Sequence, residues 1–312
     1  MKNENSAKLG SITVTYHPVP EIVARQLASL PANCLKLLVD NGSTSSEKGE
    51  LLHAIRGLEK VHMLELDANL GIAAALNRGI DYLASLGGAD WVLLLDQDSE
   101  PEEGSVGRLL EAAIERLDGG RVPGAVGPAL RDPITGKLHG FHLLDGWHYR
   151  RIAAEYDHSH VECVGINGSG TLAQLETFRG VGALREDLFI DHVDTEWCFR
   201  LRAQGGRFYG IPNAVFRHRM GESSRRLWLL GWRVWPERSP LRLRYLGRNT
   251  VSLIGMHHVP AAWKVWAVGK LVLTGGLVLL TGPRRVASLA ALLRGAVDGV
   301  CGRGGAIREP KA

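Results

Sequence analysis

Short apolar runs alternate with amphipathic segments through the first two-thirds of the chain, and this alternation restricts the fold more than any other feature. The runs have the length and composition of buried strands and cover residues 11–17, 35–40, 61–67 and 91–96. Segments with helical periodicity separate them, at residues 21–30, 49–58 and 71–87. Apolar strands joined by helices form parallel sheets that are covered on both faces. We therefore expect an α/β fold with a Rossmann-like, mostly parallel sheet flanked by helices.

The sheet is predicted to continue beyond this first half, after which the composition changes. Residues 125–130, 161–172 and 208–218 favour further strands, and residues 194–205 favour a helix between the last two. A chain of 312 residues is long enough for one large α/β domain and an appendage. We place the boundary near residue 225, between an α/β domain at 1–225 and a helical region at 226–312.

The helical region differs from the rest of the chain in charge. Residues 238–297 contain nine Lys or Arg and no Asp or Glu, although the net charge of the whole chain is only +4. Five of the eight tryptophans lie beyond residue 227. This basic region contains no recognisable nucleic-acid-binding motif, so we expect no nucleic-acid partner.

An apolar run in this region raises the question of a membrane. It has 13 residues between Lys270 and Arg284, whereas a spanning helix needs ~20. Arg and Trp around such a run favour a helix that lies in the plane of an anionic membrane. The alternative is an ordinary core helical hairpin with a basic solvent face.

Two features that the sequence lacks indicate the cellular compartment of the protein. The four cysteines contain no CxxC pair and no even spacing, which argues against a zinc ribbon or a disulfide framework. The first ten residues lack the apolar core of a signal peptide. We therefore expect a cytoplasmic protein, peripheral to a membrane if the C-terminal region binds one.

Two carboxylates follow the apolar strand at 91–96. Asp96 and Asp98 are two positions apart, which places both side chains on one side of an extended backbone. Like charges this close repel unless a cation lies between them, and Mg²⁺ or Mn²⁺ prefers oxygen ligands of this kind. The alternative is a solvated turn in which Asp98 caps the next helix.

Asp40 and Asn69 also lie just past predicted strands. Ligands of open α/β sheets bind outside the carboxyl ends of the strands, so we expect Asp40, Asn69 and Asp96 to gather at one edge. An alternative for Asp40 is the closure of a turn in "DNGS", and for Asn69 a helix cap.

Six motifs in a fixed order support a more specific interpretation. They are "TYHP", "DNGS", "DQDSEP", "GSGTL", "IDHVDTEWCFRLRAQG" and "YLGRN", beginning at residues 15, 40, 96, 168, 190 and 245. From about residue 11 to 223 the chain resembles the inverting family 2 glycosyltransferases, and these motifs look like its rhamnosyltransferase branch, which builds bacterial surface polysaccharides such as O-antigen. The resemblance implies a GT-A fold and places the nucleotide-sugar site and the catalytic residues in 1–225.

The resemblance also implies which residues bind the sugar nucleotide. Thr15, Tyr16 and Asp40 would hold the nucleobase and ribose. Asn69 and Gly71 would begin the helix at 71–87, on which Asn77 and Arg78 would face the nucleotide. A solvated Arg78 is the alternative.

A metal site is implied at Asp96, Asp98 and His218, the last in the position of the family's downstream histidine. Either Asp96 contacts the Mg²⁺ or Mn²⁺ directly, or it holds the ribose while Asp98 carries the ion. As a lone histidine between two arginines, His218 would otherwise indicate a basic surface.

The general base is assigned by resemblance to Asp194, although Val193 departs from the commoner "EDVD" motif. Asp191 and Glu196 are competitors, and Asp194 could instead cap the helix that follows. The glycine loop at Gly168, Ser169 and Gly170, together with Glu196, would lie on the acceptor side; the alternative for the loop is a plain turn.

We therefore hypothesise a metal-dependent, inverting transferase. It would move a sugar, L-rhamnose from dTDP-L-rhamnose, onto a lipid-linked glycan at the cytoplasmic face of the bacterial inner membrane. One alternative is a UDP-hexose or UDP-galactofuranose donor on the same scaffold, and another is a non-catalytic scaffold that binds nucleotide sugars or glycans. A nucleotidyltransferase would need a glycine-rich phosphate loop, which "TYHPVPE" does not provide. Whether the protein forms a homo-oligomer stays open.

Overall fold

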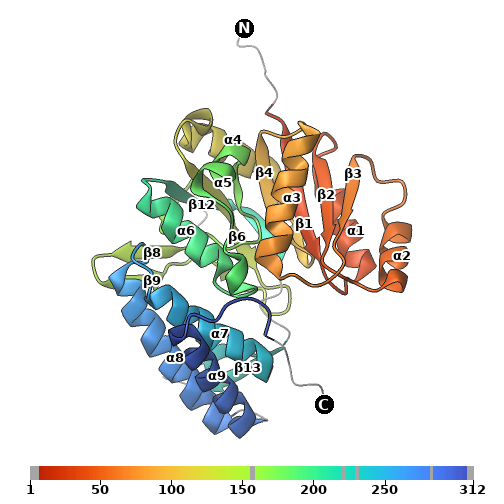
Figure 1. Ribbon diagram of the computed structural model, residues 1–312. Coiled ribbons are helices and arrows are strands. Elements are labelled where there is room, and N and C mark those ends of the chain that lie inside the picture. Colours follow the sequence, from red (N-terminus) through yellow and green to blue (C-terminus); the bar gives the residue numbers. More distant parts are fainter. Residues whose placement is uncertain (1–6, 155–158, 219–222, 229–231, 282–283, 308–312) are drawn as a thin grey trace.

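The computed structural model describes residues 7–154, 159–218, 223–228, 232–281 and 284–307. Its centre is a sheet of ten strands, eight of which follow the order β10-β12-β6-β11-β4-β1-β2-β3 (Figure 1). Helices cover both faces of this sheet, and a bundle of three C-terminal helices, α7 to α9, packs below it. The predicted α/β class is confirmed.

The first four long strands are parallel. They are β1 (Leu9–Thr15), β2 (Leu35–Asp40), β3 (Val61–Glu65) and β4 (Trp91–Asp96). In their register, Thr15 lies beside Asp40 and Val14 beside Asp96. The carboxyl ends of β1, β2 and β4 therefore meet at one edge, as the sequence predicts.

Alternate residues of these strands enter two separate cores. Leu37 and Val39 pack with the helices α3 (Ile72–Leu86), α5 (Leu175–Val181) and α6 (Val193–Ala203). Leu38 packs on the opposite face with α1 (Pro20–Ser29), α2 (Ser45–Ala54) and α4 (Ser105–Arg116). Burial on both faces explains why the strands lack polar alternation.

The second half of the sheet is mixed. The strands β6 (Gly124–Arg131) and β12 (Arg207–His218) are parallel, and the short β11 (Leu172–Gln174) runs antiparallel between β4 and β6. The prediction of one strand over 161–172 is wrong. Its ends form β10 (Val161–Cys163) and β11, and the glycine-rich residues 164–171 between them form a loop.

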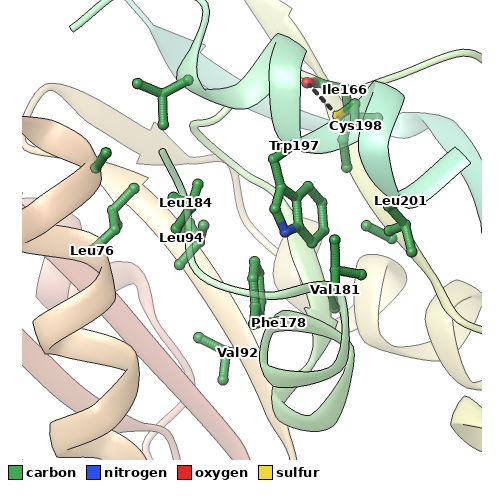
Figure 2. Close-up of a cluster of buried hydrophobic side chains, with 14 of the residues drawn as sticks. Leu76, Val92, Leu94, Ile166, Phe178, Val181, Leu184, Trp197, Cys198 and Leu201 are labelled. Carbon is green, nitrogen blue, oxygen red and sulfur yellow. Dashed lines mark hydrogen bonds between the residues drawn. The ribbon is translucent and has the colours of Figure 1, made fainter. Parts of the chain in front are cut away.

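Figure 2 shows how α6 is fixed to this loop. Trp197 stacks on Phe178 of α5 with ring centroids 5.0 Å apart, and the buried Cys198 thiol donates to the carbonyl of Ile166 at 3.7 Å. Leu94 of β4 lies in the same cluster. Helix α6 and the loop before β11 are thus held in one packed unit.

Two short strands flank the turn after β4 and the edge of β6. They are β5 (Ser99–Pro101), which pairs with β12, and β7 (Leu138–His139), which pairs with β6. Two hairpins lie outside the main sheet: β8 (His142–Asp145) with β9 (His148–Arg151), and β13 (Ser223–Trp228) with β14 (Trp232–Glu237). The proposed boundary near residue 225 falls within β13, where only the backbone is described.

The C-terminal bundle consists of α7 (Pro240–Ile254), α8 (Ala261–Thr281) and α9 (Arg285–Val300). Helix α8 is longer than the 13-residue run suggests, because apolar residues continue on the N-terminal side of Lys270. Among the described residues, Ala261–Leu280 is the one helix long and apolar enough to cross a membrane, with mean hydropathy 1.5 and 22% of it buried in the protein.

One side of α8 is buried and the other is not. Trp263 and Ala267 face the protein. On the opposite side, Val265, Val268 and Val272 are 66%, 48% and 71% exposed, at the spacing of one helix face. The sequence suggests either a helix lying on a membrane or a core helical hairpin with a basic solvent face. The structure combines parts of both, since α8 packs in a bundle and also presents an apolar face.

Candidate active site

The turn after β4 is held from two sides by glutamine side chains. The Gln97 amide accepts from the Tyr16 backbone N–H at 2.8 Å and donates to the Tyr16 carbonyl at 3.2 Å, which ties the ends of β4 and β1 together. From α1, the buried Gln26 amide donates to the carbonyls of Asp96 and Ser99, both at 2.6 Å. Asp98 caps no helix, because the N-cap of α4 is Gly104.

His218 joins Asp96 and Asp98 at this edge. The antiparallel pairing of β5 with β12 places His218 opposite Ser99, whose hydroxyl lies 2.6 Å from His218 Nδ1. The same nitrogen is 3.4 Å from a carboxylate oxygen of Asp98. One ligand atom from each of Asp96, Asp98 and His218 lies within 4.8 Å of the other two.

The electrostatics of this trio favour a bound cation. Burial, together with the charges of Asp98 and Asp194, raises the pKa of Asp96. Burial acts against the imidazolium of His218, but the hydrogen bond to Asp98 and the charges of the two carboxylates raise its pKa overall. Because the pKa of His218 is raised even though burial opposes its positive charge, the carboxylates around it leave an excess of negative charge at this site.

The donor set fits a divalent metal ion. Two carboxylates and one imidazole suit Mn²⁺, and carboxylates alone with water suit Mg²⁺. Their partners in the protein, Ser99 for His218 and Gln26 for the turn, hold the donors in fixed positions.

The glycine loop at residues 167–171 connects this trio with Asp194. The Ser169 hydroxyl accepts from the Asp96 backbone N–H at 3.1 Å and donates to the Ser99 hydroxyl at 2.6 Å. The Gly168 backbone N–H donates to Asp194 Oδ2 at 3.0 Å. A Cβ on Gly170, which has φ +88°, would overlap Pro128, so the loop packs tightly at this point.

Asp194 lies in the first turn of α6 rather than at its cap, which is His192. Its Oδ1 accepts from the Thr195 backbone N–H at 2.7 Å, so both oxygens are oriented by backbone donors. Asp191 is different, because both of its oxygens accept from the Arg242 guanidinium, at 2.7 and 3.0 Å. Of the two candidate bases, Asp194 has no cation bonded to its carboxylate in the part of the chain that the structure describes.

Helix α7 holds the turn that leads into α6. Phe189, Asp191 and His192 have positive φ values of 62–64°, which is unfavourable for residues with side chains. The buried Asn249 amide donates to the carbonyls of Leu188, Ile190 and Asp191 at 2.6–3.0 Å. The motif "YLGRN" therefore belongs to the site, although it lies beyond residue 225.

Truncation of Asn249 tests this role. We expect Asn249→Ala to lower the free energy of unfolding by about 3 kcal/mol, because the turn carbonyls of Ile190 and Asp191 lose the donor that Asn249 provides. The Leu188 carbonyl keeps its bond from Arg248. Urea denaturation followed by circular dichroism measures the change. Asn213→Ala, at an exposed position of β12, is the matched control, and an equal effect of the two substitutions would refute the role of Asn249.

The residues predicted to hold the nucleotide lie at the ends of β1 and β2. Tyr16 is 41% exposed, whereas Thr15 and Asp40 are fully buried. Asp40 accepts from the Thr15 hydroxyl at 3.3 Å and from the Ser43 backbone N–H at 2.9 Å. These are the contacts of the turn-closing alternative, and the contact of Asp40 with a ribose stays a prediction.

Asn69 and Gly71 shape the start of α3. The Asn69 carbonyl oxygen accepts from the Asn41 amide at 3.1 Å and from the Gly71 backbone N–H at 3.0 Å. Gly71 is the N-cap with φ +87°, and a Cβ there would lie 2.6 Å from the Phe189 carbonyl oxygen. The α3 start and the turn before α6 are therefore in direct contact.

Two residues of α3 that were predicted to face the nucleotide contact other parts of the protein. The buried Asn77 bonds to the backbone of Leu184 at 2.8 and 2.9 Å, so the prediction that it faces the nucleotide is wrong. Arg78 pairs with Glu186 at 3.3 Å and its side chain is 45% exposed, which corresponds to the alternative of a solvated arginine.

The placement of Glu196 on the acceptor side is also wrong. Its side chain is 0% exposed, accepts from Arg200 at 2.9 and 3.0 Å and lies 3.0 Å from His258. A carboxylate buried in these contacts stabilises α6 and cannot reach a substrate.

Comparison with known proteins decides the family. Residues 12–168 match the model of glycosyl transferase family 2. The protein belongs to this family of glycosyltransferases. The glycosyltransferase is 28% identical to the dTDP-rhamnosyl transferase RfbF of Shigella flexneri, over 95% of this chain and 97% of the relative. It is 31% identical to an N-acetylglucosaminyl-diphospho-decaprenol L-rhamnosyltransferase of Mycobacterium tuberculosis, over 69% of this chain and 77% of the relative.

Solved structures show the same fold for the glycosyltransferase. The mannosyltransferase PcManGT of Pyrobaculum calidifontis, in complex with GDP-Man and Mn²⁺, superposes with a TM-score of 0.55 at 16% identity, over 94% of this chain and 87% of that one. Residues 1–349 of TarS from S. aureus superpose with a TM-score of 0.54 at 13% identity, over 94% and 81%. The expected GT-A fold is thus confirmed.

Proposed function

We propose that this glycosyltransferase transfers L-rhamnose from dTDP-L-rhamnose to a lipid-linked glycan, with inversion and with a divalent metal ion. The observation that carries the donor assignment is the end-to-end similarity to the dTDP-rhamnosyl transferase of Shigella flexneri. The name of the mycobacterial relative, which specifies a decaprenol-linked substrate, supports the class of acceptor.

The chemistry of transfer assigns the residues. The acceptor hydroxyl must lose its proton as it attacks the sugar, and Asp194 accepts that proton as general base. Gly168 and Thr195 donate to its two oxygens, which fixes the carboxylate as the proton arrives. Asp96, Asp98 and His218 would hold the metal ion, which neutralises the negative charge on the leaving diphosphate.

The glycine loop connects the proposed general base with the proposed metal site. Ser169 bonds to Asp96 on one side, and Gly168, next to it, bonds to Asp194 on the other. The loop therefore fixes the position of the proposed base relative to Asp96. We propose that Tyr16, which is exposed just after β1, contacts the nucleoside part of the donor, and that the buried Asp40 supports this position through Thr15.

The C-terminal bundle supports attachment to the cytoplasmic face of an anionic membrane. Besides the exposed face of α8, four apolar residues of α9 are 57–80% exposed: Val286, Leu293, Val297 and Val300. Exposed apolar faces next to many cations and few acids are typical of helices that lie on anionic lipid. The bilayer is thus the proposed occupant of these two faces.

A donor screen tests the proposal. Purified protein, Mn²⁺ or Mg²⁺ and membranes with lipid-linked acceptors are incubated with dTDP-L-rhamnose, UDP-glucose or UDP-galactofuranose, and release of the nucleoside diphosphate is measured. We expect turnover with dTDP-L-rhamnose at least about tenfold above the UDP-sugars, a preference of about 1.4 kcal/mol. Turnover only with UDP-sugars would exclude rhamnose, and no turnover with any donor would favour a binding scaffold.

A further inference from the structure

A cluster of cations lies on the α8 side of the candidate active site. It consists of Arg151 at the end of β9, Arg238 just before α7 and Lys270 in α8, and we call it the basic patch. Its aromatic floor is formed by Tyr149 and Trp266, whose ring centroids are 5.0 Å apart. Lys270 Nζ lies 4.6 Å from the centre of the Trp266 ring.

Arg238 and Arg151 lie close enough to Lys270 for their charges to act on it. Surrounding protein atoms, followed by the charges of Arg238 and Arg151, lower the pKa of Lys270 to about 8, so it stays mainly protonated at neutral pH. Among the described residues, the acid whose charge acts on both Lys270 and Arg238 is Asp191. Both oxygens of Asp191 are already bonded to Arg242, so the patch keeps an excess of positive charge.

The patch lies between two features with assigned roles. Toward the sheet, the Trp266 ring lies 6.4 Å from Trp263, whose ring lies 5.6 Å from His192, the N-cap of the helix that carries the candidate base. On the other side of α8, opposite Lys270, lies the exposed apolar face of Val265, Val268 and Val272. The cations therefore lie between the apolar side of α8 and the candidate base.

We propose that the basic patch binds the phosphate groups of the lipid-linked acceptor. This inference rests on the proposed function and adds to it a binding site for one part of the substrate. A molecule built as lipid, phosphate and sugar matches this order. Its chain would lie beside α8 and its sugar at Asp194, with its phosphates on Lys270, Arg238 and Arg151. The Trp266 and Tyr149 rings provide an apolar base on which the first isoprene unit packs.

Binding of farnesyl diphosphate tests the proposal without knowledge of the acceptor sugar. Titration calorimetry is done in detergent with Mg²⁺ and saturating dTDP, which fills the donor site. We expect farnesyl diphosphate to bind at least about tenfold more tightly than farnesol, and Lys270→Ala and Arg238→Ala each to weaken it by about tenfold, the size of a charge-assisted contact. Binding of farnesol and of dTDP is expected to stay unchanged in both variants.

Arg294→Ala is the matched control, because Arg294 is an exposed arginine of α9 away from the patch. An equal loss in this control, or unchanged binding in the two patch variants, would overturn the proposal. The other possible source of phosphate is the lipid headgroup of the bilayer. Sedimentation with vesicles of phosphatidylglycerol or phosphatidylcholine distinguishes binding to these headgroups from binding to the acceptor. If the patch variants lose only their binding to phosphatidylglycerol vesicles, the patch recognises the bilayer and not the acceptor.

The same titration separates this inference from the donor assignment. A protein that binds dTDP and turns over dTDP-L-rhamnose, but does not distinguish farnesyl diphosphate from farnesol, keeps the proposed function and loses the phosphate site. A protein that makes this distinction but releases no nucleoside diphosphate from any donor loses the proposed function.

Discussion

Asp194→Asn is expected to lower kcat by about 10³-fold, within the range that a positioned general base contributes. The amide cannot accept the proton of the acceptor hydroxyl, and its single oxygen keeps one of the two backbone contacts, with Gly168 or with Thr195. Because donor binding does not need the base, the KM for the donor should change by less than about twofold, a difference of below 0.5 kcal/mol. Initial rates with radiolabelled donor measure both parameters.

Two further variants make this result specific. Asp81→Asn, at an exposed position of α3, controls for the loss of one charge and should have parental kcat. Asp191→Asn weakens the pair with Arg242 but removes no proposed proton acceptor, so its kcat should fall less than that of Asp194→Asn. If Asp191→Asn is the more damaging substitution and Asp194→Asn keeps most of its activity, the base has been assigned to the wrong residue.

Removal of the metal ion is expected to have the second largest effect. Chelation with EDTA should abolish transfer, and added Mn²⁺ should restore it. Asp98→Asn and His218→Ala should each lower kcat by about 10²-fold or more, because the charge on the leaving diphosphate is then poorly neutralised. They should also raise the Mn²⁺ concentration needed for half-maximal activity, which a titration of initial rate against Mn²⁺ measures.

His53→Ala is the matched control for this prediction, since His53 is an exposed histidine of α2 outside the site. Full activity in the presence of EDTA would show that transfer proceeds without a metal ion. Parental dependence on Mn²⁺ in both Asp98→Asn and His218→Ala would place the metal ion elsewhere.

The fold could be predicted where burial leaves a strong pattern. The runs at β1, β2 and β4 lack polar alternation because helices cover both of their faces, and this pattern also gave the edge at which Asp40 and Asp96 lie. The short strands β8, β9 and β11 could not be predicted. Each has only three or four residues, too few to establish a period.

The candidate site was only partly predictable for a similar reason. His218 lies 120 positions after Asp98, and only the resemblance to a family connects them. Gln26, Gln97 and Ser169 hold the site together, but a polar residue in a turn or on a helix is too common to indicate such a role. Asn249 lies in a quoted motif, yet its three carbonyl partners are about 60 positions away in sequence.

Helical geometry by itself argues against Glu196 on the acceptor side. Two residues after Asp194 on an α-helix, a side chain points to the opposite side, and so only one of the two can face the substrate. Arg200 follows Glu196 by four positions, which predicts the ion pair that the structure contains. No such rule applies to Asn77 and Arg78, because both residues contact other parts of the protein from different sides of α3.

The anomeric configuration of the product tests the central claim most directly. In the proposed mechanism Asp194 acts as a base and the acceptor oxygen attacks the sugar directly, while a metal ion held by Asp96, Asp98 and His218 would neutralise the leaving diphosphate. Nuclear magnetic resonance of the product, through the one-bond carbon–hydrogen coupling at the anomeric carbon of the transferred rhamnose, identifies its configuration. We predict the configuration opposite to that in dTDP-L-rhamnose, and a product with the configuration of the donor would contradict the mechanism.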